Sequence, residues 1–227
     1  MKTIYQGKTK DIREKDGKTY FFFKDDVTGK DGVFDPGENQ VGLSIEGSGR
    51  AGIAMSKYFF EKFEKQGIPT HYINADVDNR LMEIKPATVF GKGLEVICRY
   101  IATGSFVRRY GRYINDGDKL NEYVEFTLKD DERQDPLINE DALLQLGIFK
   151  EGEYDRIKEL MRSITKVIAE DLAERGLTLY DIKLEFGRLA GSDEIVLIDE
   201  ISGGNMRVYK GDEYIEPLTL SKMIVGE

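Results

Sequence analysis

The chain is poor in the residues that carry most thiol and imidazole chemistry. Among its 227 residues there are one cysteine, Cys98, one histidine, His71, and no tryptophan. This excludes an internal disulfide, a zinc site built from several cysteines and a paired-histidine metal site. Cys98 ends an apolar segment, which predicts a buried, inert thiol, and His71 is expected to be structural. A Ser-His-Asp triad would depend on His71 alone and lacks a Gly-x-Ser-x-Gly elbow, so that chemistry is disfavoured.

Long apolar runs and an excess of positive charge are also missing. No segment approaches the length of about 20 apolar residues that a membrane span needs, and residues 1–6 lack the apolar core of a signal peptide. The formal net charge is −9, which disfavours a basic nucleic-acid binder. We therefore expect a soluble, cytoplasmic globular protein with neither nucleic acid nor membrane as partner. Any anion would be bound by positive charges that are concentrated locally.

Two segments near the C-terminal end carry the strongest pattern. Residues 180–187 alternate charged and apolar side chains, and a strand would place Asp181, Lys183 and Glu185 on one face. In residues 195–201, a short apolar run stops at Asp199 and Glu200. The polar linker between the two segments contains Gly191 and Ser192, which predicts a hairpin. An antiparallel return would bring Glu185 close to Asp199.

Carboxylates that are held close together repel each other unless a positive charge lies between them. A magnesium ion would serve, because it takes oxygen ligands and bridges to phosphates. The alternative interpretation is a sheet with one solvated charged face.

Two further segments indicate anion binding. Gly7 to Lys10 places two lysines around a turn, but it lacks the spacing of a Walker A loop, and alone it also fits a solvated basic turn. Arg99 ends an apolar strand and is followed by Thr103-Gly-Ser105 and by two more arginines. Arginine side chains together with backbone amides hold phosphate, and the alternative is a strand end followed by an amphipathic helix with solvated arginines. Arg207 follows a glycine-rich turn, where it also fits a surface residue.

The rest of the chain predicts a β-rich front and a mixed back half, with a boundary near residue 90. Residues 25–50 are rich in glycine and aspartate and are expected to be a long loop that is either disordered or functional, with a lid as the functional hypothesis. The tail after Tyr209 is expected to be short and mixed. The other predicted elements are strands at 71–74, 81–84, 94–101 and 180–201, and helices at 50–66, 141–146 and 154–175.

In their order along the chain, these segments resemble the SAICAR synthetase family, the phosphoribosylaminoimidazole-succinocarboxamide synthases of purine biosynthesis. The resemblance covers most of the chain. The matching segments are Tyr5 to Lys10, Phe23 to Asp26, Gly67 to Thr70, Glu95 to Arg99, Thr103 to Gly111, Lys129 to Pro136, Asp181 to Gly187 and Asp199 to Arg207.

The resemblance implies an α+β fold with a small antiparallel β N-terminal lobe (residues 1–90), which covers the nucleotide, and a larger ATP-grasp-type C-terminal lobe (residues 91–227). It implies an ATP-dependent ligase that joins L-aspartate to 5-amino-1-(5-phosphoribosyl)imidazole-4-carboxylate, giving SAICAR, ADP and phosphate. The cofactors would be ATP and Mg²⁺. The family is commonly oligomeric, so a homo-oligomer stays open.

Position by position, the resemblance also implies roles for single residues. Those on the nucleotide side are Gly7, Lys8, Lys10 and Lys129, with Glu185 and Asp199 as magnesium ligands. Those on the ribonucleotide phosphate are Arg99, Ser105 and Arg207. Lys183 would lie near the reacting carboxylate, and Asp181 is a candidate for the base by position.

The chain departs from the family pattern in several places. Ser202 is followed by Gly203-Gly204-Asn205, where the family usually has Pro and Asp, so the amino-acid site is less defined than the nucleotide site. The segment 25–50 is longer than usual, and the C-terminal helix of the family is expected to be almost absent. Two other functions remain as alternatives: a small-molecule kinase and a non-catalytic nucleotide-binding regulator.

Overall fold

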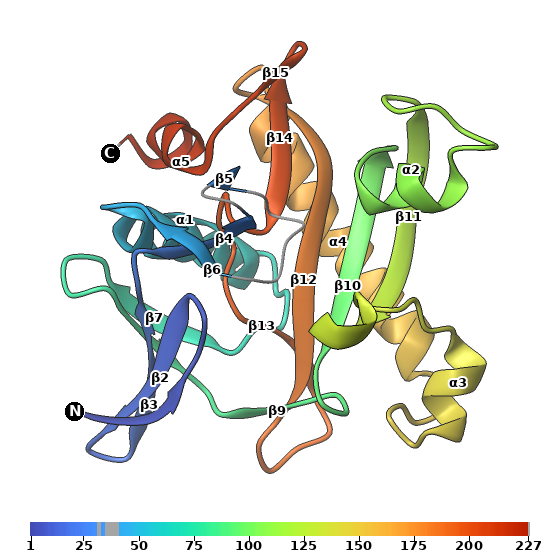
Figure 1. The fold of residues 1–227 in the computed structure, drawn as a ribbon. Helices are drawn as coiled ribbons and strands as arrows, with labels where there is room; N and C mark the ends of the chain where they lie inside the picture. Colours follow the sequence, from blue (N-terminus) through green and yellow to red (C-terminus); the bar gives the residue numbers. More distant parts are fainter. Residues whose placement is uncertain (31–32, 35–40, 227) are drawn as a thin grey trace.

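The computed structural model describes residues 1–30, 33–34 and 41–226. The first half of the chain builds a five-stranded antiparallel sheet in the spatial order β1-β2-β3-β8-β7 (Figure 1). Its strands are β1 (Lys2–Gln6), β2 (Lys10–Lys15), β3 (Lys18–Phe23), β7 (Tyr72–Asp76) and β8 (Leu81–Ile84). The predicted strand at 81–84 is therefore confirmed.

Two tight turns set the register of the first three strands. Between β1 and β2, the amide of Gly7 donates to the carbonyl of Lys10 at 2.9 Å. A Cβ at Gly7 would lie 2.4 Å from that carbonyl oxygen, so the turn requires glycine. Between β2 and β3, Asp16 and Gly17 both have positive φ, which is the backbone of a two-residue hairpin turn.

The segment at 25–50 differs from the expected long loop. β4 (Asp26–Lys30) pairs with β5 (Val33–Phe34) and with β6 (Val41–Ser44) in a small antiparallel sheet, and helix α1 begins soon after, at Ser48–Lys65. Glycine and aspartate mark turns in isolated sequence, but pairing across strands has overridden that local preference. Residues 31–32 and 35–40 lie outside the described part, so the lid stays a prediction.

The second half of the chain builds a seven-stranded sheet around the long strand β12. Its main order is β11-β10-β12-β14-β15, and β9 and β13 also pair with β12 (Figure 1). The bounds are β9 (Ala87–Val89), β10 (Leu94–Ile101), β11 (Lys119–Leu128), β12 (Thr178–Leu189), β13 (Ile195–Ile198), β14 (Met206–Lys210) and β15 (Glu213–Tyr214). The strand at 94–101 and the hairpin of β12 with β13 are confirmed.

Helix α4 (Glu153–Ala173) covers one face of this sheet and leaves the other face for the site (Figure 1). Its buried side chains recur every three or four residues, from Ile157 through Ile164 to Leu172, and Gly176 with positive φ lies just past its end. The remaining helices are α2 (Ser105–Tyr110), α3 (Glu140–Gln145), α5 (Pro217–Val225) and a short 3₁₀ helix at Asp131–Arg133.

Helix α5 corrects the expectation of a tail without a further helix. It begins with Pro217, whose fixed φ suits the first helical position, and it packs against α1. Leu220 and Ile224 are buried in that contact. The helix is not evident from the sequence because it is short and follows a turn-rich stretch. Its apolar spacing becomes meaningful only with α1 as a partner.

One hydrophobic core joins both halves of the chain. Phe60 and Met82 from the front half belong to the same buried cluster as Leu184 and Leu197 from the back half. Strand β9 lies before residue 90 but pairs with β12. The division into lobes 1–90 and 91–227 stays a prediction. Among the helices in the described ranges, none has the length and apolar character of a membrane span.

Candidate active site

Strand β12 places its charged residues on the open face of the second sheet. Asp181, Lys183 and Glu185 form ion pairs there with side chains of neighbouring elements. The alternating apolar residues face the core and are almost fully buried: Ile182, Leu184 and Phe186. The predicted two-faced strand is confirmed.

Neighbouring strands extend this pattern into a row of charges, which we call the charged row. On β10, Glu95 lies opposite Glu185 and Arg99 lies opposite Asp181. On β14, Arg207 lies opposite Asp181 from the other side. Because a strand rises about 3.3 Å per residue, residues 181 and 185 are roughly 13 Å apart along β12. The row therefore has two separate ends, which we call the carboxylate end (Glu185 and Asp199) and the arginine end (Arg99, Asp181 and Arg207).

At the carboxylate end, the hairpin brings Glu185 and Asp199 together, as predicted. Glu185 pairs in register with Ile198, the residue before Asp199. Partial burial raises the pKa of Glu185, and the negative charge of Asp199 raises that pKa further. For Asp199, burial alone would raise the pKa, but Lys10 and Lys129 outweigh it and hold the pKa below its ordinary value.

Two lysines from different parts of the chain neutralise this end. Lys10 Nζ lies 3.0 Å from Asp199 Oδ1 and also contacts Glu200, and Lys129 Nζ lies 2.6 Å from Glu185 Oε1. Burial alone would lower the pKa of both lysines, yet the carboxylates raise both pKa values above the ordinary value. The lysines therefore stay charged, and the cluster is stable only because its positive and negative groups face each other.

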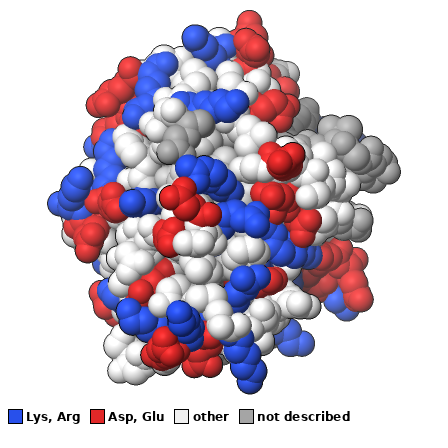
Figure 2. Space-filling model, turned by 90° about the vertical axis from the view of Figure 1, so that its left-hand side faces the viewer, with Lys and Arg blue, Asp and Glu red and all other residues white. Residues whose placement is uncertain are grey.

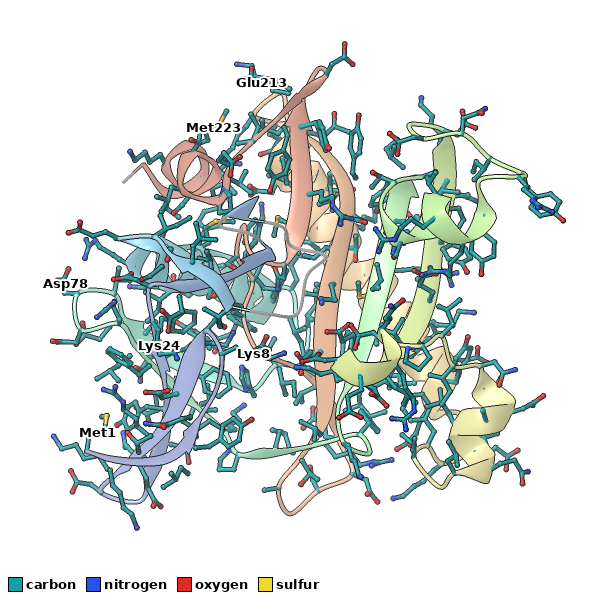
Figure 3. All side chains as sticks on the ribbon, viewed as in Figure 1. Met1, Lys8, Lys24, Asp78, Glu213 and Met223 are labelled. Atoms are coloured by element: carbon teal, nitrogen blue, oxygen red, sulfur yellow. The ribbon has the colours of Figure 1, made fainter. Side chains whose placement is uncertain are left out.

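The turn that carries Lys8 and Lys10 reaches across to the second sheet. Lys8 Nζ lies 2.6 Å from Asp131 Oδ2 in the 3₁₀ helix, and Figure 3 shows the side chain extending from the first hairpin in that direction. Lys10 lies deeper, beside Phe23 and Asp199. The expectation that Gly7, Lys8 and Lys10 surround one ligand region agrees with their positions, although their roles stay predictions.

At the arginine end, Arg99 is almost fully buried and is bound by the protein itself. Its guanidinium contacts Asp181, donates to Glu125 Oε1 at 2.8 and 3.0 Å, and donates to Ser105 Oγ at 2.8 Å. Arg109 Nη2 lies 2.6 Å from each of the two carboxylate oxygens of the same Glu125. Arg99 therefore orients the surrounding groups.

Arg207 is the more accessible arginine of this end. Its Nη1 lies 2.8 Å from Asp181 Oδ2, and its guanidinium covers Gly104, where an added Cβ would lie 2.9 Å from Nη1. Gly104 has φ 55° and immediately precedes Ser105. Ser105 and Arg207 line the same cavity as Arg108 and Arg109, and this set of cationic side chains suits an anion.

A cavity of about 100 Å³ extends from the arginine end, where Arg99 and Arg207 line it, to Lys183. Lys183 Nζ lies 2.9 Å from Glu95 Oε1, and Thr127 donates to the same carboxylate at 3.2 Å. Asp135 lines the cavity from the loop after the 3₁₀ helix. Lys183 is thus held in the middle of the charged row, where the resemblance placed it near a reacting carboxylate.

Several site residues had no role in the sequence interpretation. Glu125 and Thr127 lie on β11, a strand that we did not predict although residues 123–128 alternate polar and apolar side chains. His71 is buried, and its Nε2 lies 3.1 Å from the carbonyl oxygen of Asp199. Burial lowers the pKa of His71 to about 4, so its ring is neutral and supports the backbone of Asp199. No local signal in the sequence indicates that contact.

The donor set at the carboxylate end fits a magnesium ion. Glu185 and Asp199 offer only oxygen atoms, and among the described residues no group of three or more histidine, cysteine, aspartate or glutamate side chains is arranged to hold a metal ion by itself. Magnesium is commonly held by one or two carboxylates, with phosphates and water completing the octahedron. Two carboxylates beside two lysines therefore suit a cation that arrives together with a nucleotide.

Comparisons with known proteins agree with this geometry. A sequence profile described as SAICAR synthetase matches residues 3–223. A phosphoribosylaminoimidazole-succinocarboxamide synthase of Clostridium tetani is 56% identical over 99% of this chain and 100% of its own length. The corresponding protein of Finegoldia magna is 35% identical over 93% of this chain and 87% of its own length.

Solved structures give the same answer. The synthase of Ehrlichia chaffeensis superposes with a TM-score of 0.84 at 28% identity, covering 99% of this chain and 94% of that one. A SAICAR synthetase in complex with ADP superposes with a TM-score of 0.84 at 29% identity, covering 98% and 97%. The chain belongs to the SAICAR synthetase family.

Proposed function

We propose that the charged row is the active site of this ATP-dependent ligase and that its two ends hold the two halves of the reaction. Members of the family join L-aspartate to an imidazole ribonucleotide carboxylate, with ADP and phosphate as the other products. The observation that supports the assignment is the separation of roughly 13 Å between carboxylates and arginines on one sheet face. The phosphate on the ribose of the ribonucleotide suits the arginines, and the carboxylate on its base would then lie beside Lys183, next to the nucleotide at the carboxylate end.

We assign the nucleotide to the carboxylate end. Lys10 and Lys129 already lie beside Glu185 and Asp199, and Lys8 lies at the edge of the same region. Glu185 and Asp199 would hold the magnesium ion, which supplies positive charge beside the phosphoryl group that is transferred. The lysines would bind the remaining phosphate oxygens.

We assign the ribose phosphate to the arginine end. Arg207 and Ser105 reach the accessible region directly, while the contacts of Arg99 with Asp181 and Glu125 support a positioning role. Lys183 would then meet the base carboxylate between the two ends, where its ammonium group can neutralise charge on the reacting oxygen.

The chemistry needs positioning and charge more than a protein nucleophile. A carboxylate does not react with an amine at neutral pH until one of its oxygens becomes a leaving group. Transfer of the γ-phosphoryl group of ATP gives an acyl phosphate, and the amine of L-aspartate then displaces phosphate to form the amide. A site of lysines, arginines and carboxylates, without a cysteine nucleophile, suits this route. Cys98 is fully buried, and burial raises its pKa to about 11.

The test is release of ADP that depends on both L-aspartate and the carboxylated ribonucleotide. We expect stoichiometric ADP, phosphate and succinocarboxamide product only when all substrates are present. A stable phosphorylated nucleotide without aspartate would indicate a kinase, and ATP binding without turnover would indicate a regulator. Isothermal titration with ADP in the presence and absence of Mg²⁺ tests the metal assignment separately, because binding should tighten with the ion.

We also propose a cytoplasmic location, because ATP and the other substrates are small charged metabolites of the cell interior. The surface supports this assignment only in a general way. Figure 2 shows positive and negative side chains interspersed over one face, without a broad region of one sign. A homo-oligomer stays a prediction that light scattering of the purified protein can test.

A further inference from the structure

Strands β13 and β14 pair one after the other with the same edge of β12, and residues 199–205 loop out between them. The pairing of β13 ends with Ile198 opposite Glu185, and that of β14 begins with Met206 opposite Ile182. Strand β10 occupies the other edge of β12. We call residues 199–205 the crossover loop. It connects the carboxylate end of the charged row to the arginine end, so its path helps to set the distance between them.

Polar side chains from both halves of the chain hold the backbone of the crossover loop. Three consecutive carbonyl oxygens each contact one such side chain: that of Asp199 contacts His71 Nε2 at 3.1 Å, that of Glu200 contacts Asn205 Nδ2 at 2.7 Å and that of Ile201 contacts Ser56 Oγ at 3.1 Å. Asp199 has φ 71°, a conformation that a residue other than glycine keeps only where its surroundings enforce it. These contacts therefore fix the point from which the Asp199 carboxylate enters the site.

Among these side chains, that of Asn205 joins the start of the crossover loop to its end. Its Nδ2 donates to the carbonyl of Glu200, and its Oδ1 accepts from the amide of Ser202 at 3.1 Å. The carbonyl of Asn205 accepts from the amide of Lys183 at 2.8 Å, which continues the pairing of β14 with β12 by one residue. Arg207 follows two residues later on β14. Asn205 therefore ties the loop segment beside Asp199 to the two cations of the charged row that lie nearest to it in the sheet.

The crossover loop is also the stretch in which this chain departs from the family pattern. A Cβ at Gly203 would lie 2.6 Å from Cα of Pro217, the first residue of α5, so any larger residue there would displace that helix. Helix α5 in turn packs against α1, which carries Ser56. The loop is thus enclosed from outside by α1 and α5, and Asn205 closes it from inside.

We propose that Asn205 is a positioning residue that fixes the carboxylate end relative to Lys183 and Arg207, and so aligns the two substrates for phosphoryl transfer. The inference rests on the proposed ligase function. The phosphoryl group at the carboxylate end must meet the base carboxylate beside Lys183, and a displacement of about 1 Å can lower such a rate about 100-fold. Both polar groups of the Asn205 side chain bind the backbone of the crossover loop, so the residue acts through the loop.

Asn205→Ala is the test, and Asn79→Ala is its matched control. Asn79 likewise closes a turn, with its Nδ2 donating to Asp76 Oδ2 at 2.8 Å, and Asp78 of the same turn lies far from β12 in Figure 3. For each variant, kcat and KM are measured together with the dissociation constants of the ribonucleotide and of ADP with Mg²⁺. Thermal unfolding checks the fold. Asn205→Asp keeps the shape and the acceptor and removes only the donor to Glu200, so it replaces the alanine variant if that one does not fold.

For Asn205→Ala we expect kcat to fall roughly 30- to 100-fold, with both dissociation constants within about threefold of the wild type, because the binding groups are present but misaligned. Asn79→Ala should keep kcat within about twofold. A loss carried by KM and by the dissociation constants at unchanged kcat would overturn the proposal and make Asn205 a binding residue. An unchanged kcat with unchanged affinities would overturn it as well. A wild type without aspartate-dependent ADP release would refute the proposed function, and the inference would fall with it.

Discussion

The two ends of the charged row are built in opposite ways. The arginine end joins side chains of adjacent strands in one sheet, and its central guanidinium is 2% exposed and bound by two carboxylates. The carboxylate end gathers Lys10 from the first hairpin, Lys129 from the end of β11, Glu185 from β12 and Asp199 from beyond β13. Its side chains keep more contact with water, since that of Lys129 is 44% exposed and that of Asp199 is 28% exposed.

This contrast separates structural charge from functional charge. Buried ions that satisfy each other are expensive to break, so Arg99 with its two carboxylates should behave as part of the fold, while the more accessible Arg207 can contact a ligand. At the carboxylate end, a ligand can replace one member of a lysine–carboxylate pair without leaving an unpaired charge in the core. Both ends resemble binding sites in sequence, but the effect of a substitution should differ between them. The predictions below test that difference.

Arg99→Met should produce the largest effect, and the effect should be on stability. Removing the guanidinium leaves Glu125 and Asp181 buried with less compensation, which costs about 3–5 kcal/mol. For a chain of this size, that corresponds to a fall in Tm of roughly 10 °C. Thermal unfolding checks it, with Arg207→Met as the control because that side chain is more accessible. Arg207→Met should keep its Tm within a few degrees and raise the KM for the ribonucleotide.

The opposite result for Arg99 would erase the contrast between the two ends. Arg99→Met could instead unfold like the wild type and raise the ribonucleotide KM by a factor that corresponds to about 1.5–3 kcal/mol of binding free energy. In that case the residue binds the phosphate directly. That is the role implied by the family resemblance, and the measurement decides between the two interpretations.

Asp199→Asn should have a large effect on turnover and a small one on stability. Asp199 has φ 71°, a conformation that asparagine adopts readily, so the backbone is kept while the charge is lost. We expect turnover to fall roughly 100- to 1000-fold, because a metal site contributes several kcal/mol to the transition state. ADP release and thermal unfolding are measured together. Normal turnover would remove the metal assignment.

Lys10→Met and Lys8→Met compare the inner and outer lysines of one turn. Lys10 contacts Asp199 and Glu200 and is mostly shielded, whereas the pair of Lys8 with Asp131 is about half exposed. At Lys10, loss of a charged hydrogen-bond partner should raise the KM for ATP by a factor that corresponds to about 1.5–3 kcal/mol of binding free energy. At Lys8 the rise should stay within about fivefold, because exposed pairs contribute little. Equal effects would show that the turn acts through its net charge.

Local patterns in the sequence were enough for some elements and not for others. The strands at 81–84 and 94–101 and the two faces of β12 follow from alternation and from apolar runs. The small sheet at 26–44 did not follow, because its glycine and aspartate residues favour turns until three strands pair.

The sequence indicated which residues are candidates for the site, but not which side chains contact them. The resemblance identified Lys10, Glu185 and Asp199, and the hairpin correctly brought the last two together. It gave no sign that Glu125 and Asp181 would bind Arg99 internally, because burial of a charge depends on strands far apart in sequence. The contact of His71 with Asp199 likewise depends on the bridge between Thr70 and Leu197. Such contacts require the tertiary structure.

The smallest expected effect concerns Cys98, which lies on β10 and belongs to neither end of the charged row. Burial raises its pKa from 9.0 to about 11, so the unfolded chain loses this proton at lower pH than the folded chain does. The stability that Cys98 contributes is therefore complete below pH 9 and is lost as the pH rises toward 11. Between pH 8 and pH 10 the loss should be about 1 kcal/mol. Urea unfolding of the wild type and of Cys98→Ala over this range checks it: the wild type should lose more stability than the variant. Parallel pH profiles would mean that the thiol is not shielded in solution, and the packing of β10 behind Arg99 would then be looser than the structure indicates.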